Sequence, residues 1–104
     1  MKGFEVWHRT PYIPMIVAPD ISSFSEKDYE KVAFVFCETM GDAFRLTNHI
    51  DRSWWYNEEV KWCIEGKRST SVGDVIIERN WPDEPIKGKP VVVEGLGFRK
   101  LKIE

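Results

Sequence analysis

The sequence predicts an α+β fold, in which a small, mostly antiparallel sheet or half-open barrel carries one short helix. Three observations support this fold class. Several short segments alternate apolar and polar residues with the period of two that is typical of a β-strand. One segment instead places its apolar residues at helical spacing. The chain of 104 residues, with 42% hydrophobic residues, five tryptophans and six phenylalanines, has the material for the core of one domain spanning residues 1–104.

The chain before the helix predicts three extended segments and one helical turn. Residues 3–9 (GFEVWHR) alternate with the period of a strand, and residues 15–18 (MIVA) predict a short extended segment bounded by prolines. The polar residues that follow predict a helical turn with Ser25 as its N-cap and Asp28 at its third position. Residues 31–38 (KVAFVFCE) are rich in β-branched and aromatic side chains and therefore predict a strand.

The helix is predicted over residues 40–48. Thr39 is suited to be its N-cap, and Asp42 follows three residues later, where an acidic residue favours a helix start. Asn48 is suited to the C-terminal end, because asparagine tolerates the left-handed conformation found there. The face of the helix that packs on the sheet is predicted to consist of Met40, Ala43, Phe44 and Thr47.

The remaining chain predicts three more strands. Residues 59–65 (EVKWCIE) alternate, and residues 74–79 (DVIIER) follow a turn-rich loop. Residues 90–103 are expected to close the chain with one strand that Gly95 and Gly97 interrupt at a bulge. The predicted order of elements is β-β-β-α-β-β-β.

Composition and charge exclude several classes of protein. The net charge is −2 and the isoelectric point about 5.7, whereas autonomous DNA-binding domains usually have an isoelectric point above ~9. No secretory signal is visible, and no apolar run approaches the ~20 residues of a membrane span, so we expect a cytoplasmic protein with no membrane partner. Cys37 and Cys63 each lie in an apolar run, which favours buried free thiols over a disulfide or a functional thiol.

Residues 45–59 (RLTNHIDRSWWYNEE) concentrate side chains that are typical of functional sites in a predicted loop. His49 and Asp51 are spaced as two potential metal ligands, but the chain has only two histidines and two cysteines, so we expect no metal. The alternative is that Thr47, Asn48 and Asp51 cap the helix and shape the turn. Of the adjacent Trp54 and Trp55, we expect one in the core and the other partly exposed as a recognition anchor, unless both cover the edge of the core.

Residues 67–74 (KRSTSVGD) form a second candidate loop. Backbone amides in a glycine-containing turn, together with Arg68 and the hydroxyl groups of Ser69 and Ser71, could hold a phosphate or a carboxylate. The glycine spacing of a P-loop is absent. The alternative is a polar turn that reverses the chain into the strand that follows.

Three segments carry a resemblance to known proteins: FRLTNHIDRSWWYNEEV, RSTSVGDVI and VEGLGFRKL. They resemble a loose group of small proteins carried by phages, archaeal viruses and plasmids, which share a TN-x-x-x-x-x-W segment, an RSxSVGDVI segment and a terminal GF before a hydrophobic residue. The second segment is also similar to the YodL-like domain, and its VGDVI turn is similar to one in PUA and ASCH-type barrels that bind RNA. The resemblance covers about residues 32–101 and implies a viral or mobile-element origin, where small proteins often bind and inhibit host machinery, including restriction and CRISPR systems.

These observations lead to three hypotheses, all of which require the two loops to meet in space. The leading one is a non-enzymatic binding protein whose partner is a host or viral protein. The second is a module that binds RNA or single-stranded DNA by aromatic stacking. The third is a small enzyme that acts on a nucleotide or phosphate-bearing substrate with His49 as the acid or base. No cofactor is implied. The predicted binding residues are Asn48, His49, Asp51, Arg52, Trp54, Trp55, Arg68, Ser69 and Ser71.

Overall fold

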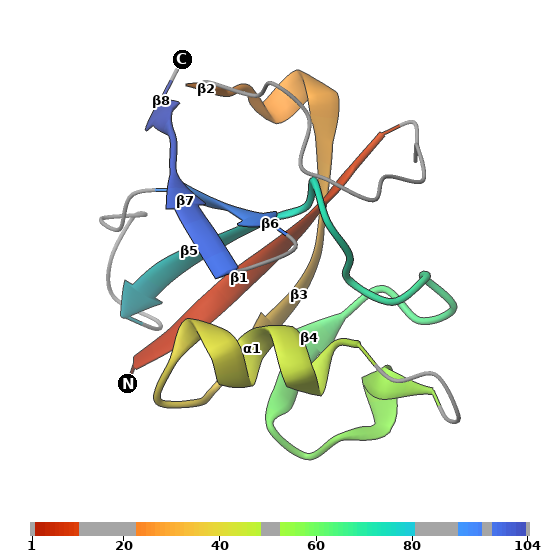
Figure 1. The fold of residues 1–104 in the computed structure, drawn as a ribbon. Coiled ribbons are helices and arrows are strands. Elements are labelled where there is room, and N and C mark those ends of the chain that lie inside the picture. The colour runs from red at the N-terminus through yellow and green to blue at the C-terminus, as the bar shows by residue number, and fades with distance from the viewer. Residues whose placement is uncertain (1, 11–22, 49–52, 81–89, 95–96, 104) are drawn as a thin grey trace.

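The fold is built on an open, six-stranded antiparallel sheet in the order β4-β3-β1-β5-β6-β7 (Figure 1). The computed structural model describes residues 2–10, 23–48, 53–80, 90–94 and 97–103. The strands are β1 (Lys2–Arg9), β2 (Ser23–Phe24), β3 (Tyr29–Val35), β4 (Val60–Cys63), β5 (Val75–Asn80), β6 (Pro90–Glu94), β7 (Gly97–Lys100) and β8 (Lys102–Ile103). The described helices are the 3-10 helices η1 (Glu26–Asp28) and η2 (Trp54–Tyr56) and the α-helix α1 (Met40–Leu46). The predicted α+β class is confirmed.

The sheet separates two layers of core, because successive residues of a strand point to opposite faces. Phe4 and Val6 of β1 belong to the clusters that α1 covers with Ala43 and Leu46. Trp7 points to the other face, where β2 and β8 pair in parallel as a separate two-stranded ladder. The cluster on that face consists of Trp7, Phe24, Tyr29, Val75, Ile77, Val92 and Leu101.

The α-helix forms where its spacing predicts it and ends slightly earlier than expected. The Thr39 hydroxyl accepts a hydrogen bond from the Asp42 amide at 3.1 Å, so the predicted N-cap is confirmed. The helix ends at Leu46 with Thr47 as its C-cap. The prediction of a left-handed Asn48 is wrong, because among the described residues only glycines have a positive φ.

The end of the chain differs from the prediction of one strand interrupted by a bulge. Residues 90–94 and 97–100 are two antiparallel strands, β6 and β7, which pair from Val91 with Lys100 to Glu94 with Gly97. Gly97 has a φ of +136°, a conformation that L side chains rarely adopt, and the chain reverses its direction before it. Glycine is compatible with a bulge and with a reversal, so the sequence did not distinguish the two.

Several smaller predictions have clear outcomes. The helical turn predicted after Ser25 is present as η1, but the Ser25 side chain makes no capping hydrogen bond. The extended segment predicted for residues 15–18 lies outside the described residues. Cys37 and Cys63 are free, as predicted, but half-buried rather than buried. Burial raises the pKa of Cys37 to about 11 and also raises that of Cys63, so both thiols are protonated at neutral pH. None of the helices in the described ranges has the length and apolar character needed to cross a membrane.

Candidate functional site

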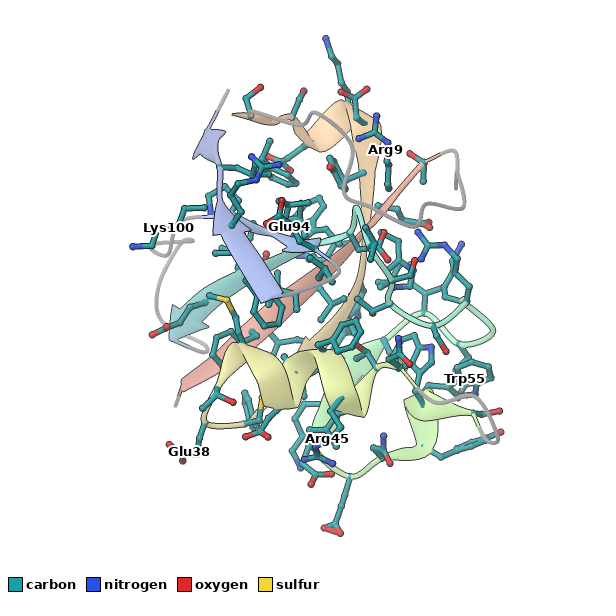
Figure 2. The ribbon with its side chains drawn as sticks, in the orientation of Figure 1. Arg9, Glu38, Arg45, Trp55, Glu94 and Lys100 are labelled. Carbon is teal, nitrogen blue, oxygen red and sulfur yellow. The ribbon has the colours of Figure 1, made fainter. Side chains whose placement is uncertain are left out.

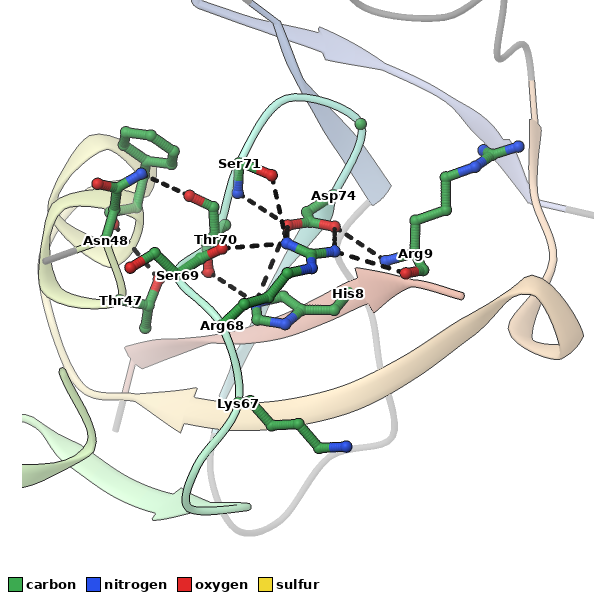
Figure 3. Close-up of polar contacts among 12 residues, drawn as sticks. His8, Arg9, Thr47, Asn48, Lys67, Arg68, Ser69, Thr70, Ser71 and Asp74 are labelled. Atoms are coloured by element: carbon green, nitrogen blue, oxygen red, sulfur yellow. Dashed lines mark hydrogen bonds and ion pairs between the residues drawn. The ribbon is translucent and has the colours of Figure 1, made fainter. Parts of the chain in front are cut away.

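The two loops singled out in the sequence meet directly, in the segments that the structure describes (Figure 3). The Thr70 amide donates to the Thr47 carbonyl at 2.9 Å. The Asn48 side-chain amide donates to the Thr70 carbonyl at 2.5 Å, and the Thr70 hydroxyl donates to the Thr47 hydroxyl at 2.8 Å. The C-terminal end of α1 and residues 67–74 are therefore one connected unit, which we call the loop junction.

Asp74 is the centre of the loop junction. Its carboxylate is 1% exposed and receives the Arg68 guanidinium in bidentate fashion, at 2.6 and 2.7 Å. The backbone amides of Ser71 and Arg9 donate to the same carboxylate at 2.8 and 2.9 Å. The arginine and amide donors that predicted a site for an external anion are thus present, but they bind the carboxylate of the loop itself.

Further donors of this loop are engaged within the protein. The Gly73 amide donates to the Val93 carbonyl at 2.9 Å, and the Lys67 ammonium forms an ion pair with Glu30 at 2.9 Å. Arg68 also donates to the Ser69 carbonyl at 3.0 Å and to the Ser71 hydroxyl at 3.2 Å. The alternative prediction, a polar turn that leads into the next strand, describes this loop, because β5 begins at Val75.

His8 joins the junction from β1, and its tautomer follows from its neighbours. Its Nε2 lies 3.0 Å from the Thr70 hydroxyl oxygen. That hydroxyl already donates its proton to Thr47, whose own hydroxyl donates to the Ala43 carbonyl at 2.8 Å. The Thr70 oxygen must therefore accept the Nε2 proton of His8, which leaves His8 Nδ1 without a proton and without a hydrogen-bond partner.

Burial keeps His8 neutral. The imidazole is 3% exposed, and desolvation lowers its pKa from 6.5 to about 4, although the negative charge of Asp74 acts in the opposite direction. Its Nε2 is also 3.9 Å from an Asp74 oxygen. A buried imidazole whose single proton is already donated has no access to a substrate, so the contacts of His8 stabilise the fold rather than support acid–base chemistry.

The aromatic turn, Trp54–Tyr56, packs against the loop junction. Trp54 is 1% exposed, and its indole N–H is shared between the Lys67 and Arg68 carbonyls at 3.1 Å each. Trp55 is half-buried at the edge of the molecule (Figure 2) and meets Trp54 edge-on, with ring centroids 5.6 Å apart. The prediction of one buried and one partly exposed tryptophan is confirmed. Sequence reasoning missed Tyr56, which is 77% exposed.

The predicted binding residues therefore fall into three groups. Asn48, Trp54 and Arg68 hold the junction together by the contacts given above. Trp55, Ser69 and Ser71 are half-buried. His49, Asp51 and Arg52 lie outside the described residues. Within the described ranges, no group of three or more histidine, cysteine, aspartate or glutamate side chains is arranged to hold a metal ion.

Sequence reasoning also missed a pocket on the sheet face opposite α1. A cavity of about 250 Å³ is lined there by Glu5, Lys31, Phe34, Trp62 and Arg79, which come from four strands. The available signal was the alternation in residues 3–9, which places Glu5 and Trp7 on one face of the same strand. The sequence did not show that this glutamate is buried beside a cavity.

Comparison of the chain with protein-family models, with curated proteins and with solved structures found no match. The resemblance to small phage, archaeal-virus and plasmid proteins stays a prediction.

Proposed function

We propose that the chain is a non-enzymatic protein-binding module that uses the aromatic turn as its anchor. The observation that carries this proposal is an exposed Tyr56 beside a half-buried Trp55, with ring centroids 6.1 Å apart, on a turn whose backbone is held from two sides. Aromatic residues of this kind are enriched at the energetic centres of protein interfaces, because they bury a large area with few rotatable bonds.

The turn is preorganised by contacts at both of its ends. At its start, the buried Trp54 indole donates to two carbonyls of the loop junction. After it, the Asn57 side chain donates to the Leu46 carbonyl at 2.8 Å, which connects the turn to the end of α1. A surface that is already ordered loses less conformational entropy on binding, so its contacts contribute more fully to affinity.

The charges around the turn favour a protein partner over a nucleic acid. Glu58 and Glu59 follow the turn and line a shallow hollow of about 460 Å³ together with Phe36 and Lys61. Two adjacent carboxylates repel a phosphate backbone, whereas they complement a basic rim around an apolar pocket on a protein. Arg68 has no part in this surface, because its guanidinium is bound by Asp74; we assign it a positioning role. The resemblance stated above leads us to propose a host or viral protein as the partner.

The test is a comparison of proteins captured from prokaryotic lysate by tagged wild-type chain and by a Trp55→Ala/Tyr56→Ser double variant. We expect a stoichiometric protein partner that persists at high salt and is lost with the double variant, because the partner buries both rings. Trp62→Leu, a substitution of an exposed tryptophan on the other sheet face, is the matched control and should retain the partner. Circular dichroism would check that each variant is folded. If the double variant captured the partner as well as the wild type does, the aromatic turn would not be the binding surface. If the chain instead captured nucleic acid that high salt releases, the partner would be a nucleic acid rather than a protein.

A further inference from the structure

The pocket on the sheet face opposite α1, which we call the sheet-face pocket, is built from residues that the strand register brings together. Glu5 of β1 lies opposite Phe34 of β3, and Phe34 lies opposite Trp62 of β4. Arg79 of β5 lies opposite Gly3, two residues from Glu5 and therefore on the same face. Lys31 lies opposite Trp7 at the end of this group toward η1. The pocket shares no residue with the aromatic turn.

Its floor holds a fully buried carboxylate. Glu5 is 0% exposed, accepts a hydrogen bond from the Trp7 indole at 3.0 Å and forms an ion pair with Arg79. The Lys31 ammonium lies 3.8 Å from the same carboxylate, beyond hydrogen-bonding distance. Since the lining contains one carboxylate and two cations, the pocket has one excess positive charge. Burying a carboxylate is costly unless charged and hydrogen-bonding partners compensate it, and Arg79 and the Trp7 indole do so for Glu5.

The walls are aromatic and flat. Phe34 lies across Gly3 so closely that a Cβ at that position would stand 2.7 Å from its ring, and the Arg79 guanidinium lies over the same ring at 5.7 Å. Trp62 is 45% exposed. The Lys31 ammonium lies over two aromatic rings, 5.6 Å from the ring centroid of Trp62 and 5.8 Å from that of Trp7.

We propose that the sheet-face pocket binds a small planar ring that carries an anionic group, of the class of nucleoside monophosphates and aromatic carboxylates. The ring would stack on Trp62, a contact that contributes ~1–3 kcal/mol for a nucleobase. The anionic group would bind the Lys31 ammonium. Lys31 makes only a loose contact with Glu5, because the negative charge of Glu5 is already balanced by Arg79. The volume of about 250 Å³ is slightly below the ~300 Å³ at which small-molecule sites begin, so it suits one ring rather than a strand.

The experiment is a titration followed by the tryptophan indole N–H signals in proton–nitrogen NMR. The Trp62 signal is identified by its loss in Trp62→Leu. The probes are AMP and UMP as nucleotides, benzoate and indole-3-acetate as aromatic carboxylates, adenosine as the uncharged ring, and a short single-stranded RNA. We expect saturable shifts of the Trp62 signal with at least one ring anion, and weaker binding of adenosine than of AMP.

The variants separate the two halves of the site. Trp62→Leu should weaken binding by about tenfold, as expected from the loss of one stacking contact, measured through the backbone amide signals of β3 and β4. Lys31→Met keeps the length of the side chain and should weaken the ring anions while leaving adenosine unchanged. Tyr56→Ser alters the aromatic turn and should change the affinity for neither the ring anions nor adenosine. The ring-anion site and the aromatic turn can therefore fail their tests independently.

Each remaining outcome decides the proposal. Binding of nucleotides alone, of aromatic carboxylates alone or of both supports it and identifies the source of the ring anion. The absence of saturable shifts with all probes, or unchanged affinity in Trp62→Leu, overturns it. Tight binding of the RNA with no binding of AMP, UMP or the carboxylates would also overturn it, in favour of a strand-binding surface.

Discussion

The loop junction and the sheet-face pocket contain the same chemical pair, a buried carboxylate held by an arginine, in two different settings. Asp74 is bound by Arg68 and by two backbone amides, all within 2.9 Å. Glu5 is bound by Arg79 and the Trp7 indole, while its second cation, Lys31, lies 3.8 Å away beside a cavity. These partners of Asp74 are all in direct contact with it, so this carboxylate stabilises the structure. Glu5 holds Lys31 only loosely beside a cavity, which leaves that cation available to a ligand.

The largest expected effect is the loss of the ion pair between Asp74 and Arg68. Asp74→Asn removes the charge that balances Arg68, so the guanidinium is left uncompensated in a mostly buried position. We expect a loss of about 3 kcal/mol in the free energy of unfolding, measured by urea denaturation. Glu94→Gln is the matched control, because the partly exposed pair of Glu94 with Arg99 at 2.9 Å should contribute less than ~1 kcal/mol. Similar losses in both variants would contradict the structural role given to Asp74.

The second prediction concerns pH and the buried His8. The unfolded chain takes up a proton at this residue near pH 6.5, whereas the folded protein does so only near pH 4. The folded protein therefore binds fewer protons between these values, and its stability is full above pH 6.5 and falls as the pH decreases toward 4. The expected loss is about 3 kcal/mol, measured by urea denaturation across this range. His8→Gln retains a hydrogen-bond donor for Thr70 and should reduce the difference in the free energy of unfolding between pH 6.5 and pH 4. An unchanged pH dependence in this variant would contradict the role given to His8.

A third prediction tests the wall of the sheet-face pocket with two alanine substitutions of opposite expected sign. Gly3→Ala would place a methyl group 2.7 Å from the Phe34 ring and 2.8 Å from the Val35 carbonyl oxygen, and we expect a destabilisation of about 2 kcal/mol. Gly41→Ala in α1 would meet only the Thr39 hydroxyl at 3.8 Å and should stabilise the helix by roughly 0.5–1 kcal/mol. Thermal unfolding of both variants checks these signs, and a stable Gly3→Ala protein would show that both the Phe34 ring and the Val35 backbone can move away.

The regular elements could be predicted from the sequence because their signals are local. The alternation in residues 3–9 and the spacing of Met40, Ala43 and Phe44 depend only on backbone geometry. The reversal before Gly97 was missed because a glycine in a strand is compatible with a bulge as well as with a reversal. Which tryptophan is buried was also undetermined, since Trp54 and Trp55 are identical neighbours in a predicted loop, where no strand or helix periodicity assigns their faces.

Some donors of the loop junction were predicted, but the group that they bind was not. Arg68, Ser71 and the turn amides are the donors that would bind an external phosphate, and they are equally suited to bind a carboxylate. Asp74 lies only six residues after Arg68, but the sequence does not reveal that its side chain turns back onto that guanidinium. The sheet-face pocket depends on the register of four strands far apart in the chain, so local patterns did not identify it.

The last prediction compares the two carboxylates directly and depends on the ring-anion site proposed above. Glu5→Gln removes the negative charge from the sheet-face pocket and leaves Lys31 and Arg79 in place, so the affinity for AMP or benzoate should rise by roughly threefold to tenfold. Asp74→Asn should leave that affinity unchanged in the folded protein, because Asp74 lies in the loop junction and does not line the pocket. The same NMR titration measures both. Weaker binding by Glu5→Gln would mean that Glu5 positions the cations more than it neutralises them, and the two carboxylates would then have the same structural role.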